Sequence, residues 1–397
     1  MLDRMATKRL YLDFNATAPL HPSARAAMIA ALDVCGNASS IHSEGRAARS
    51  LVEAARSKVA LLAGAVAKNV VFTSGGTEAA NLALTPSLRD GRGNGFGRLL
   101  IGAGEHACVL QGHRFAGADV RVLPLLADGT LDLSALAAAL DGLNGLRPVL
   151  ALQAASNETG VIQPVAEAAR LVHAKDGLVI CDAVQAAGRI ACSFATLEAD
   201  AMILSAHKLG GPKGAGALVF AADHLHIGEP LVRGGGQEHG LRAGTENVAA
   251  IVGFGTMAEA AARENRENSA AAMRWATWRD HCESELRRVA PEAVVFGAGA
   301  RRLPNTSAFA VPGIAAETLL IALDLEGVAL SSGSACSSGK VRPSHVLAAM
   351  DVAPDVARGA MRASFGWSTS EDDVAGFCEA LKKTLRKIKL RRLGKAA

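Results

Sequence analysis

AMILSAHKLGGPKG, residues 201–214, is the segment from which the architecture and the chemistry of this chain can be worked out. Ala201–Leu204 are apolar and predict a buried strand. The strand leads Lys208 into a glycine-rich turn. A lysine that is removed from water and lies near other cations is less basic than usual and can form a Schiff base with a carbonyl compound. The alternative, a surface loop with ordinary lysines, stays open on this segment alone.

Six further apolar segments predict the other strands of a sheet. They are residues 70–73, 99–102, 119–123, 148–154, 178–182 and 217–220. Apolar and polar residues alternate poorly within them, which is typical of parallel strands covered on both faces. Amphipathic, alanine-rich segments separate the strands, and we expect helices at 43–63, 77–84, 133–140 and 165–175. This alternation of strands and helices indicates an α/β domain.

The length of 397 residues predicts two domains. Residues 87–97 are polar and glycine-rich, and we expect an exposed loop there. Residues 256–290 predict one long helix with a solvated polar middle, leading into a second domain of roughly 266–397. That domain would contain a strand at 307–311 and a helix at 316–325.

Composition and charge exclude several classes of protein. Half the residues are hydrophobic and 20% are charged, so a large core is feasible and a disordered chain is excluded. The formal net charge is +4, but residues 381–397 hold eight Lys/Arg and no acid. The body is therefore slightly acidic, and no nucleic-acid partner is expected for it. The basic tail predicts a surface helix with solvated lysines; the alternative is a docking site for an acidic partner or for tRNA.

The cysteines and the N-terminus indicate a cytoplasmic protein. Seven Cys without any C-x-x-C pair argue against a disulfide framework or a zinc ribbon, and for a reducing compartment. The charged N-terminus lacks an apolar region, so no signal peptide is expected. The apolar stretch at 248–258 is too short to cross a bilayer.

VVFTSGGTE, residues 70–78, predicts a strand, a glycine pair and the start of a helix. This arrangement directs free backbone N–H groups and the helix dipole at an anion, typically a phosphate. It is neither G-x-G-x-x-G nor a Walker A loop, which argues against NAD and ATP. The alternative is a simple helix cap.

VICDAVQ, residues 179–185, predicts a buried strand that ends in Asp182. A buried carboxylate needs a cationic partner, and a protonated pyridine nitrogen would serve. The alternative is an Asp that caps the next helix. Because Asp182 and Lys208 end successive strands, both would converge on one crevice of a parallel sheet.

SSGSACSSGK, residues 331–340, surrounds Cys336 with small polar residues. Such a cysteine should be exposed, and nearby Lys340 and Arg342 favour its thiolate. The other cysteines lie mostly in apolar or helical surroundings. Cys108 is an exception, because it follows His106 by two residues.

These motifs together resemble the cysteine desulfurases of the NifS/IscS type, which are class V, fold-type I pyridoxal-phosphate enzymes. The resemblance runs from YLDFNAT (11–17) to RASF (362–365). Its strongest stretches are TSGGTEAANLA (73–83), SNETGVIQP (156–164), CDAVQAAGR (181–189), SAHKLGGPKGAGAL (205–218), GGGQEHGLRAGTEN (234–247) and SSGSACSSG (331–339).

The resemblance implies a large domain at 17–265 with a mostly parallel seven-stranded sheet. It also implies a smaller α+β domain made of 1–16 and 266–397. This smaller domain would carry a mobile catalytic cysteine loop at about 331–345.

The resemblance also implies how pyridoxal 5'-phosphate would be bound. Lys208 would hold the cofactor as a Schiff base and move a proton, His106 would stack on its ring and act in proton transfer, and Asp182 would pair with the pyridinium nitrogen. The other implied cofactor contacts are Asn157 and Gln185 at the phenolic oxygen, Gly76, Thr77, Ser205 and His207 at the phosphate, and Thr245 at the phosphate of a neighbouring subunit, which implies a homodimer.

The implied reaction converts L-cysteine to L-alanine. Arg362 would clamp the substrate carboxylate with Asn37 beside it. Cys336 would accept the sulfur as a persulfide and pass it to an acceptor protein such as an iron–sulfur scaffold, for cluster assembly. Cys336 is also a candidate transient ligand of iron. The alternatives are a selenocysteine lyase or another class V aminotransferase, and, in another class, an inactive sulfur-transfer adaptor.

Overall fold

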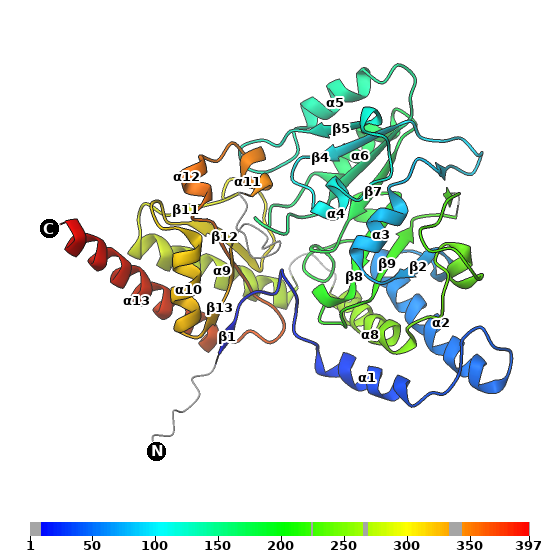
Figure 1. Cartoon of the computed structure of the whole chain (residues 1–397), viewed down its shortest axis with the longest axis horizontal. Helices are drawn as coiled ribbons and strands as arrows, with labels where there is room; N and C mark the ends of the chain where they lie inside the picture. The colour runs from blue at the N-terminus through cyan, green and yellow to red at the C-terminus, as the bar shows by residue number, and fades with distance from the viewer. Residues whose placement is uncertain (1–8, 224, 265–268, 333–343, 397) are drawn as a thin grey trace.

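A seven-stranded sheet forms the centre of the larger lobe, on the right of Figure 1. The computed structural model describes residues 9–223, 225–264, 269–332 and 344–396. In spatial order the strands are β2 (Val70–Thr73), β9 (Gly216–Phe220), β8 (Ala201–Ser205), β7 (Leu178–Asp182), β6 (Pro148–Gln153), β4 (Arg98–Gly102) and β5 (Val120–Leu123). β9 runs antiparallel to both neighbours, and all other pairs are parallel. The prediction of a mostly parallel seven-stranded sheet is confirmed.

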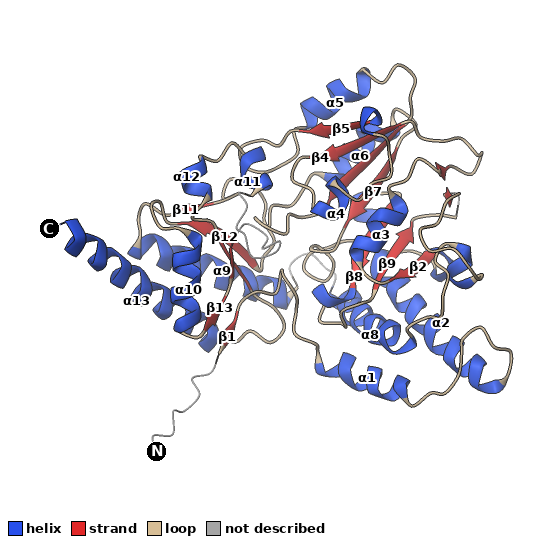
Figure 2. Ribbon diagram, in the orientation of Figure 1, coloured by secondary structure: helices blue, strands red, loops and turns tan. Residues whose placement is uncertain are grey.

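Helices cover both faces of this sheet (Figure 2). They are α1 (Pro22–Leu32), α2 (Ser43–Ala63), α3 (Gly76–Ala83), α4 (Ala107–Leu110), α5 (Leu133–Asp141), α6 (Val165–His173), α7 (Phe194–Leu197) and α8 (Val248–Glu264). Successive residues of one strand enter different cores: Met202 and Leu204 pack in one, Ala201 and Ile203 in the other. The strand is therefore apolar throughout, which is why its sequence shows no alternation.

The smaller lobe is built on a four-stranded antiparallel sheet. Its strands are β11 (Val294–Val295), β12 (Thr306–Ala310), β15 (Met361–Ser364) and β14 (Ser331–Ser332), and its helices are α9 (Ala270–Val289), α10 (Ala316–Leu325), α11 (His345–Ala349), α12 (Pro354–Ala357) and α13 (Glu371–Ala396). The N-terminal strand β1 (Leu10–Tyr11) pairs with β13 (Val328–Ala329). Leu12 is buried in the core of this lobe. The domain boundaries at 17 and 266 stay a prediction.

Two expectations from the sequence are wrong. Residues 256–290 are not one helix, because α8 ends at Glu264 and α9 begins at Ala270, where the Ser269 side chain caps the new helix by accepting from Ala272 N. Residues 87–97 are not wholly an exposed loop. The short strand β3 (Leu88–Arg89) pairs with β10 (His226–Ile227) and buries Leu88.

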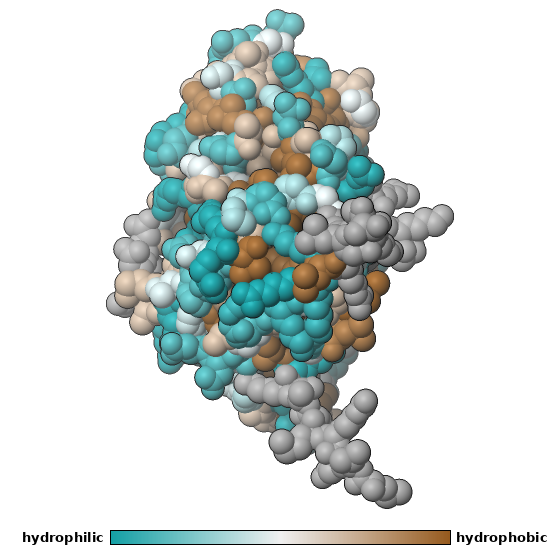
Figure 3. All heavy atoms as spheres, turned by 90° about the vertical axis from the view of Figure 1, so that its left-hand side faces the viewer, coloured by the Kyte–Doolittle hydropathy of each residue, from teal (hydrophilic) through white to brown (hydrophobic). Residues whose placement is uncertain are grey.

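Short 3-10 helices complete the described elements. They are η1 (Ala67–Asn69), η2 (Gly117–Asp119), η3 (Ala206–Lys208) and η4 (Gln237–Gly240). On the face turned to the left in Figure 1, hydrophilic and hydrophobic side chains are interspersed (Figure 3). Within the described residues, no helix combines the length and apolar character needed to cross a bilayer.

Replacing Phe254 by Ala should destabilise the large lobe, because this ring is fully buried between α8 and the sheet, with its centroid 6.3 Å from that of Phe72. A cavity of this kind costs about 3–5 kcal/mol. Leu61→Ala on α2, where the side chain is 62% exposed, is the control and should cost less than about 0.5 kcal/mol. Thermal unfolding at a fixed scan rate measures both variants. Equal midpoints for the two would contradict this packing.

Candidate active site

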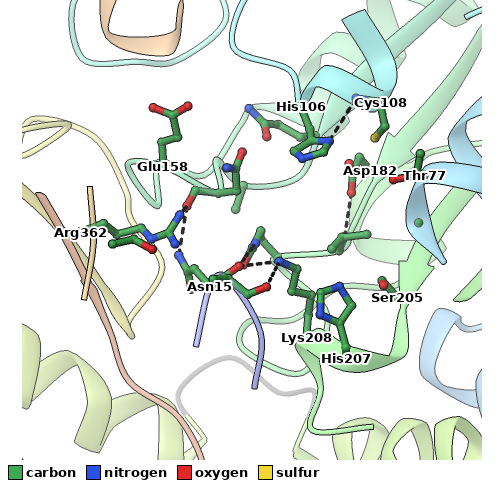
Figure 4. A pocket seen from close by; sticks show the side chains of 18 of the residues that line it. Asn15, Thr77, His106, Cys108, Glu158, Asp182, Ser205, His207, Lys208 and Arg362 are labelled. Atoms are coloured by element: carbon green, nitrogen blue, oxygen red, sulfur yellow. Dashed lines mark hydrogen bonds between the residues drawn. The ribbon is translucent and has the colours of Figure 1, made fainter. Parts of the chain in front are cut away.

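The carboxyl ends of five strands meet at one edge of the large sheet and line a cavity of about 520 Å³. β2 leads to Gly76, β4 to His106, β6 to Asn157, β7 ends in Asp182 and β8 leads to Lys208. The smaller lobe closes the opposite wall. Figure 4 shows Asp182, Thr77 and Ser205 on one side of the cavity and Arg362 and Glu158 on the other. The predicted convergence of motifs is therefore present.

The Lys208 side chain is half-buried on η3, directly after β8. Its Nζ donates to the backbone oxygens of Asn15 and Ala16, at 2.6 and 2.7 Å. Burial lowers the pKa of Lys208 to about 7, and the positive charges of Arg189 and Arg362 act in the same direction. Near neutral pH a large share of this amine is unprotonated, as a nucleophile or a general base must be.

Asp182 ends β7 as a buried carboxylate, 8% exposed. Its Oδ1 accepts from Val184 N at 2.9 Å. Among the described residues, no Lys or Arg forms an ion pair with it, and burial raises the pKa of the Asp182 carboxyl. A cationic group placed against this carboxylate would reverse that shift.

The start of α3 forms an open cradle for an anion. Backbone N–H groups at the first turn of α3 have no partner within the helix. The turn lies tightly on β9, since a Cβ at Gly216 would come within 2.5 Å of the Gly75 carbonyl carbon. Ser205 and His207 line the same space, and a second hollow of about 410 Å³ opens on it from outside. His207 Nδ1 lies 3.1 Å from Thr17 Oγ1, and burial lowers the pKa of His207 to about 4, so its ring is neutral.

His106 begins α4 and faces the cavity (Figure 4). Its Nδ1 accepts from Cys108 N at 3.1 Å, so in the neutral ring the proton is on Nε2. Partial removal from water lowers the pKa of His106. Cys108 also lines the cavity, but burial raises the pKa of its thiol to about 12, so it is not a thiolate at neutral pH.

Arg362 on β15 is 6% exposed and is held at two of its nitrogens. Nη1 donates to Asn157 O and Nη2 to Asp13 Oδ1, both at 2.8 Å. Nε is buried and has no hydrogen-bond partner. A buried unpaired donor is costly, and a carboxylate entering the cavity would satisfy it.

The remaining predicted residues are divided between the cavity and the surface. Asn157 and Gln185 line the cavity beside Asp182. Thr245 is exposed on the surface and does not line the cavity. Asn37 is also exposed, and its side chain accepts from Ser39 N at 2.8 Å, so this chain does not bring it to Arg362. The roles of Thr245 and Asn37 stay predictions.

Cys336 lies outside the described residues, as does its predicted role as an iron ligand. In the part of the chain that the structure describes, no cluster of three or more His, Cys, Asp or Glu could hold a metal ion. The predicted cysteine loop is described only at its two ends. At the first end, Ser331 and Ser332 line the cavity, and Ser331 pairs with Arg362.

The second end of this loop is held by residues of the larger lobe. The Ser344 hydroxyl accepts from Leu347 N and donates to Oε2 of the buried Glu158. The next residue, His345, donates from Nε2 to Glu105 O at 2.9 Å, directly before His106. Ser332 therefore lies at the cavity, and Ser344 is bonded to Glu158, which lines it.

Sequence reasoning missed several residues that shape this cavity. Asp13 and Asn15 belong to the YLDFNAT motif, and an acid and an amide among apolar residues were the available signal. Glu158 stood in the SNETG motif without a role. Nothing in the sequence pairs Glu158 with Ser344, because 186 residues separate them.

Comparison with known proteins gives consistent matches over most of the chain. The model of the family "Aminotransferase class-V" matches residues 10–377. A cysteine desulfurase of Cereibacter sphaeroides is 40% identical, covering 92% of this chain and 93% of that protein. An IscS-like cysteine desulfurase of Mycobacterium tuberculosis is 38% identical, covering 94% and 95%. The structure of a NifS-like protein from Rickettsia africae matches with a TM-score of 0.85 at 30% identity, covering 95% of this chain and 99% of that one.

Lys208 should react with formaldehyde and cyanoborohydride at neutral pH, because a pKa of about 7 leaves much of its amine unprotonated. The rate should rise with pH through about 7 and then level off, whereas an ordinary exposed lysine, with a pKa of about 10.4, continues to gain reactivity. Peptide mass spectrometry of the cofactor-free protein follows each site. Surface lysines of α13 provide the internal comparison. A Lys208 rate that rises no earlier than theirs would refute the lowered pKa.

Proposed function

Because the chain belongs to the aminotransferase class-V family, we propose that it is a cysteine desulfurase that uses pyridoxal 5'-phosphate. The observation that carries this proposal is the geometry of one cavity. It holds a lysine of lowered basicity, a buried carboxylate without a cation, an anion cradle and a buried arginine with a free donor. The predicted family, fold class and enzyme class agree with the comparisons.

The residues present fit pyridoxal phosphate. Lys208 would hold the aldehyde carbon, and the pyridinium nitrogen would supply the cation that Asp182 lacks. The cradle formed by Gly76, Thr77, Ser205 and His207 would take the phosphate. When bound, this cofactor acts as an electron sink for the bonds around the α-carbon of an amino acid.

Different side chains of the cavity would bind the substrate and transfer protons. Arg362 binds the substrate carboxylate through its free Nε. Lys208 can exchange a proton near neutral pH, because burial lowers its pKa to about 7, and the His106 ring, whose pKa is also lowered, takes part as a neutral imidazole. The walls that exclude water come from both lobes.

Cys336 would carry the sulfur. Its thiolate forms an S–S bond with the substrate sulfur, and the substrate Cβ–S bond breaks. The electron pair of that bond stays with the carbon fragment, which is protonated and leaves as L-alanine. The products are therefore L-alanine and a Cys336 persulfide, with no external oxidant or reductant. The position of Ser332 at the cavity and the Ser344–Glu158 hydrogen bond support this role. The four residues from Ser332 to Cys336 can span at most about 14 Å, so Cys336 stays within reach of the cavity.

The partners follow from the same proposal. A homodimer is supported by the second opening of the phosphate cradle and by the exposure of Thr245, which would reach the neighbouring subunit's phosphate. The persulfide would pass to an acceptor protein of the cytoplasm, with iron–sulfur cluster assembly as the destination suggested by the IscS-like relative.

Cys336→Ala should abolish sulfur transfer but not cofactor binding, because the thiol is the proposed acceptor. With L-cysteine and a thiol reductant, the wild type should release L-alanine and sulfide in equal amounts, and the variant at least about 100-fold less of both. Both variants should be yellow. Sulfide from Cys336→Ala at the wild-type rate would remove this residue from the mechanism. Colour changes with amino acids but no sulfide from the wild type would favour an aminotransferase.

Arg362→Lys should weaken substrate binding, because an ammonium cannot replace the Nε donor of the guanidinium. Loss of one charge-assisted hydrogen bond, about 1.5–3 kcal/mol, predicts a KM for L-cysteine about 10- to 100-fold higher. Steady-state alanine production gives KM and kcat separately. An unchanged KM would show that the carboxylate is bound elsewhere.

A further inference from the structure

Arg189 is a buried cation that forms no ion pair with any residue that the structure describes. Its side chain is 7% exposed and follows Gly188, whose φ of +71° turns the chain after β7. The guanidinium donates to Gln185 O at 3.1 Å, to Gln185 Oε1 and to Phe14 O at 3.5 Å, all of them uncharged acceptors. Among the described residues, no carboxylate forms an ion pair with it. Burying a charge without an ion-pair partner is costly.

A chain of hydrogen bonds connects Arg189 with the reactive amine. Gln185 Nε2 donates to Asn15 O at 3.0 Å, and Lys208 Nζ donates to the same oxygen at 2.6 Å. A guanidinium can only donate, so it fixes the Gln185 amide with Oε1 towards Arg189 and Nε2 towards Asn15. Gln185 lines the cavity, and with Oε1 held by Arg189 and one Nε2 hydrogen given to Asn15 O, the amide has one N–H left to donate.

Several charged or titratable groups face Lys208, from every element around it. They are Arg189 after β7, Arg362 on β15, Asp13 in the N-terminal segment, Asp182 on β7, His106 before α4 and His207 on η3. Arg362 is paired with Asp13 at 2.8 Å, and burial keeps both histidines neutral near pH 7. Arg189 is the cation of this group whose charge is offset by no carboxylate in the described part of the chain. Its effect on Lys208 adds to that of burial.

We propose that Arg189 is a positioning residue with two effects: its uncompensated charge favours the neutral form of the Lys208 amine, and its hydrogen bond to Gln185 directs an amide N–H to the phenolic oxygen of pyridoxal phosphate. The first effect depends on the protein alone. The second rests on the proposed function.

The first effect is tested in cofactor-free protein by the pH dependence of Lys208 methylation. A neighbouring cation disfavours protonation, so removing it raises the pKa. Arg189→Met should move the Lys208 titration upwards by about one pH unit. Arg189→Lys keeps the charge but loses the planar fork, and its titration should stay close to that of the wild type. A folded Arg189→Met whose Lys208 titration is not shifted would overturn the electrostatic role. If Arg189→Met does not fold, an upward shift of about one pH unit in Arg189→Lys would overturn it instead.

Arg302→Met is the matched control. The Arg302 side chain is also buried, 8% exposed, but it is paired with Glu283 at 2.6 Å. Its loss should lower stability without moving the Lys208 titration. An equal shift in Arg302→Met would mean that general loosening, and not the charge of Arg189, raises the pKa.

The second effect is tested by binding pyridoxal phosphate. Arg189→Lys should bind pyridoxal phosphate more weakly, because the Gln185 amide is no longer fixed. The visible band of the bound cofactor should titrate as in the wild type. Unchanged affinity overturns the amide role. If the wild type does not bind the cofactor at Lys208, the proposed function fails, and the methylation titration still decides the electrostatic role.

Discussion

Two hydrogen bonds from the Lys208 amine to the carbonyl oxygens of Asn15 and Ala16 connect the two lobes at the reactive lysine itself. The lysine belongs to the large sheet, whereas its acceptors follow Leu12, which is buried in the core of the smaller lobe. A small separation of the lobes would admit water to the amine and restore its basicity. The position of one lobe against the other is therefore part of the chemistry, and not only of the packing.

Groups that are costly to bury lie in and around the cavity. Asp182, Glu105 and Glu158 are carboxyls whose pKa burial raises, and Arg189 is a guanidinium whose pKa burial lowers to about 9. Such a site lowers stability, and the continuous apolar cores on both faces of the large sheet offset that cost. The apolar cores on the two faces of the sheet therefore supply stability, while the carboxyl ends of its strands hold the buried charged groups of the site.

The sequence predicts a site residue well where one short segment determines both the strand and the place of that residue at its end. Asp182 and Lys208 could be placed together because parallel strands share a carboxyl edge. The break between Glu264 and Ala270 was missed, because a run of polar residues fits a solvated helix as well as a helix end with Ser269 as cap.

Contacts between segments that lie far apart in the sequence could not be predicted, for a different reason. The Ser344–Glu158 hydrogen bond and the Arg362–Asp13 pair each join residues more than a hundred positions apart, and no local pattern specifies such a partner. The same holds for Arg189, because only its surroundings show that no described carboxylate pairs with it.

The pairing of the first residues with the last strands has a consequence for the order of synthesis. β1 pairs with β13, and Asp13 forms a bridge with Ser364. A chain that leaves the ribosome N-terminus first therefore holds its opening segment without a partner until almost all of it has been made. Until then Asp13 lacks Arg362, and the smaller lobe does not yet hold Asn15 and Ala16 against Lys208. An unfinished chain therefore lacks part of the cavity wall, and the site can take its final form only after β15 has been made.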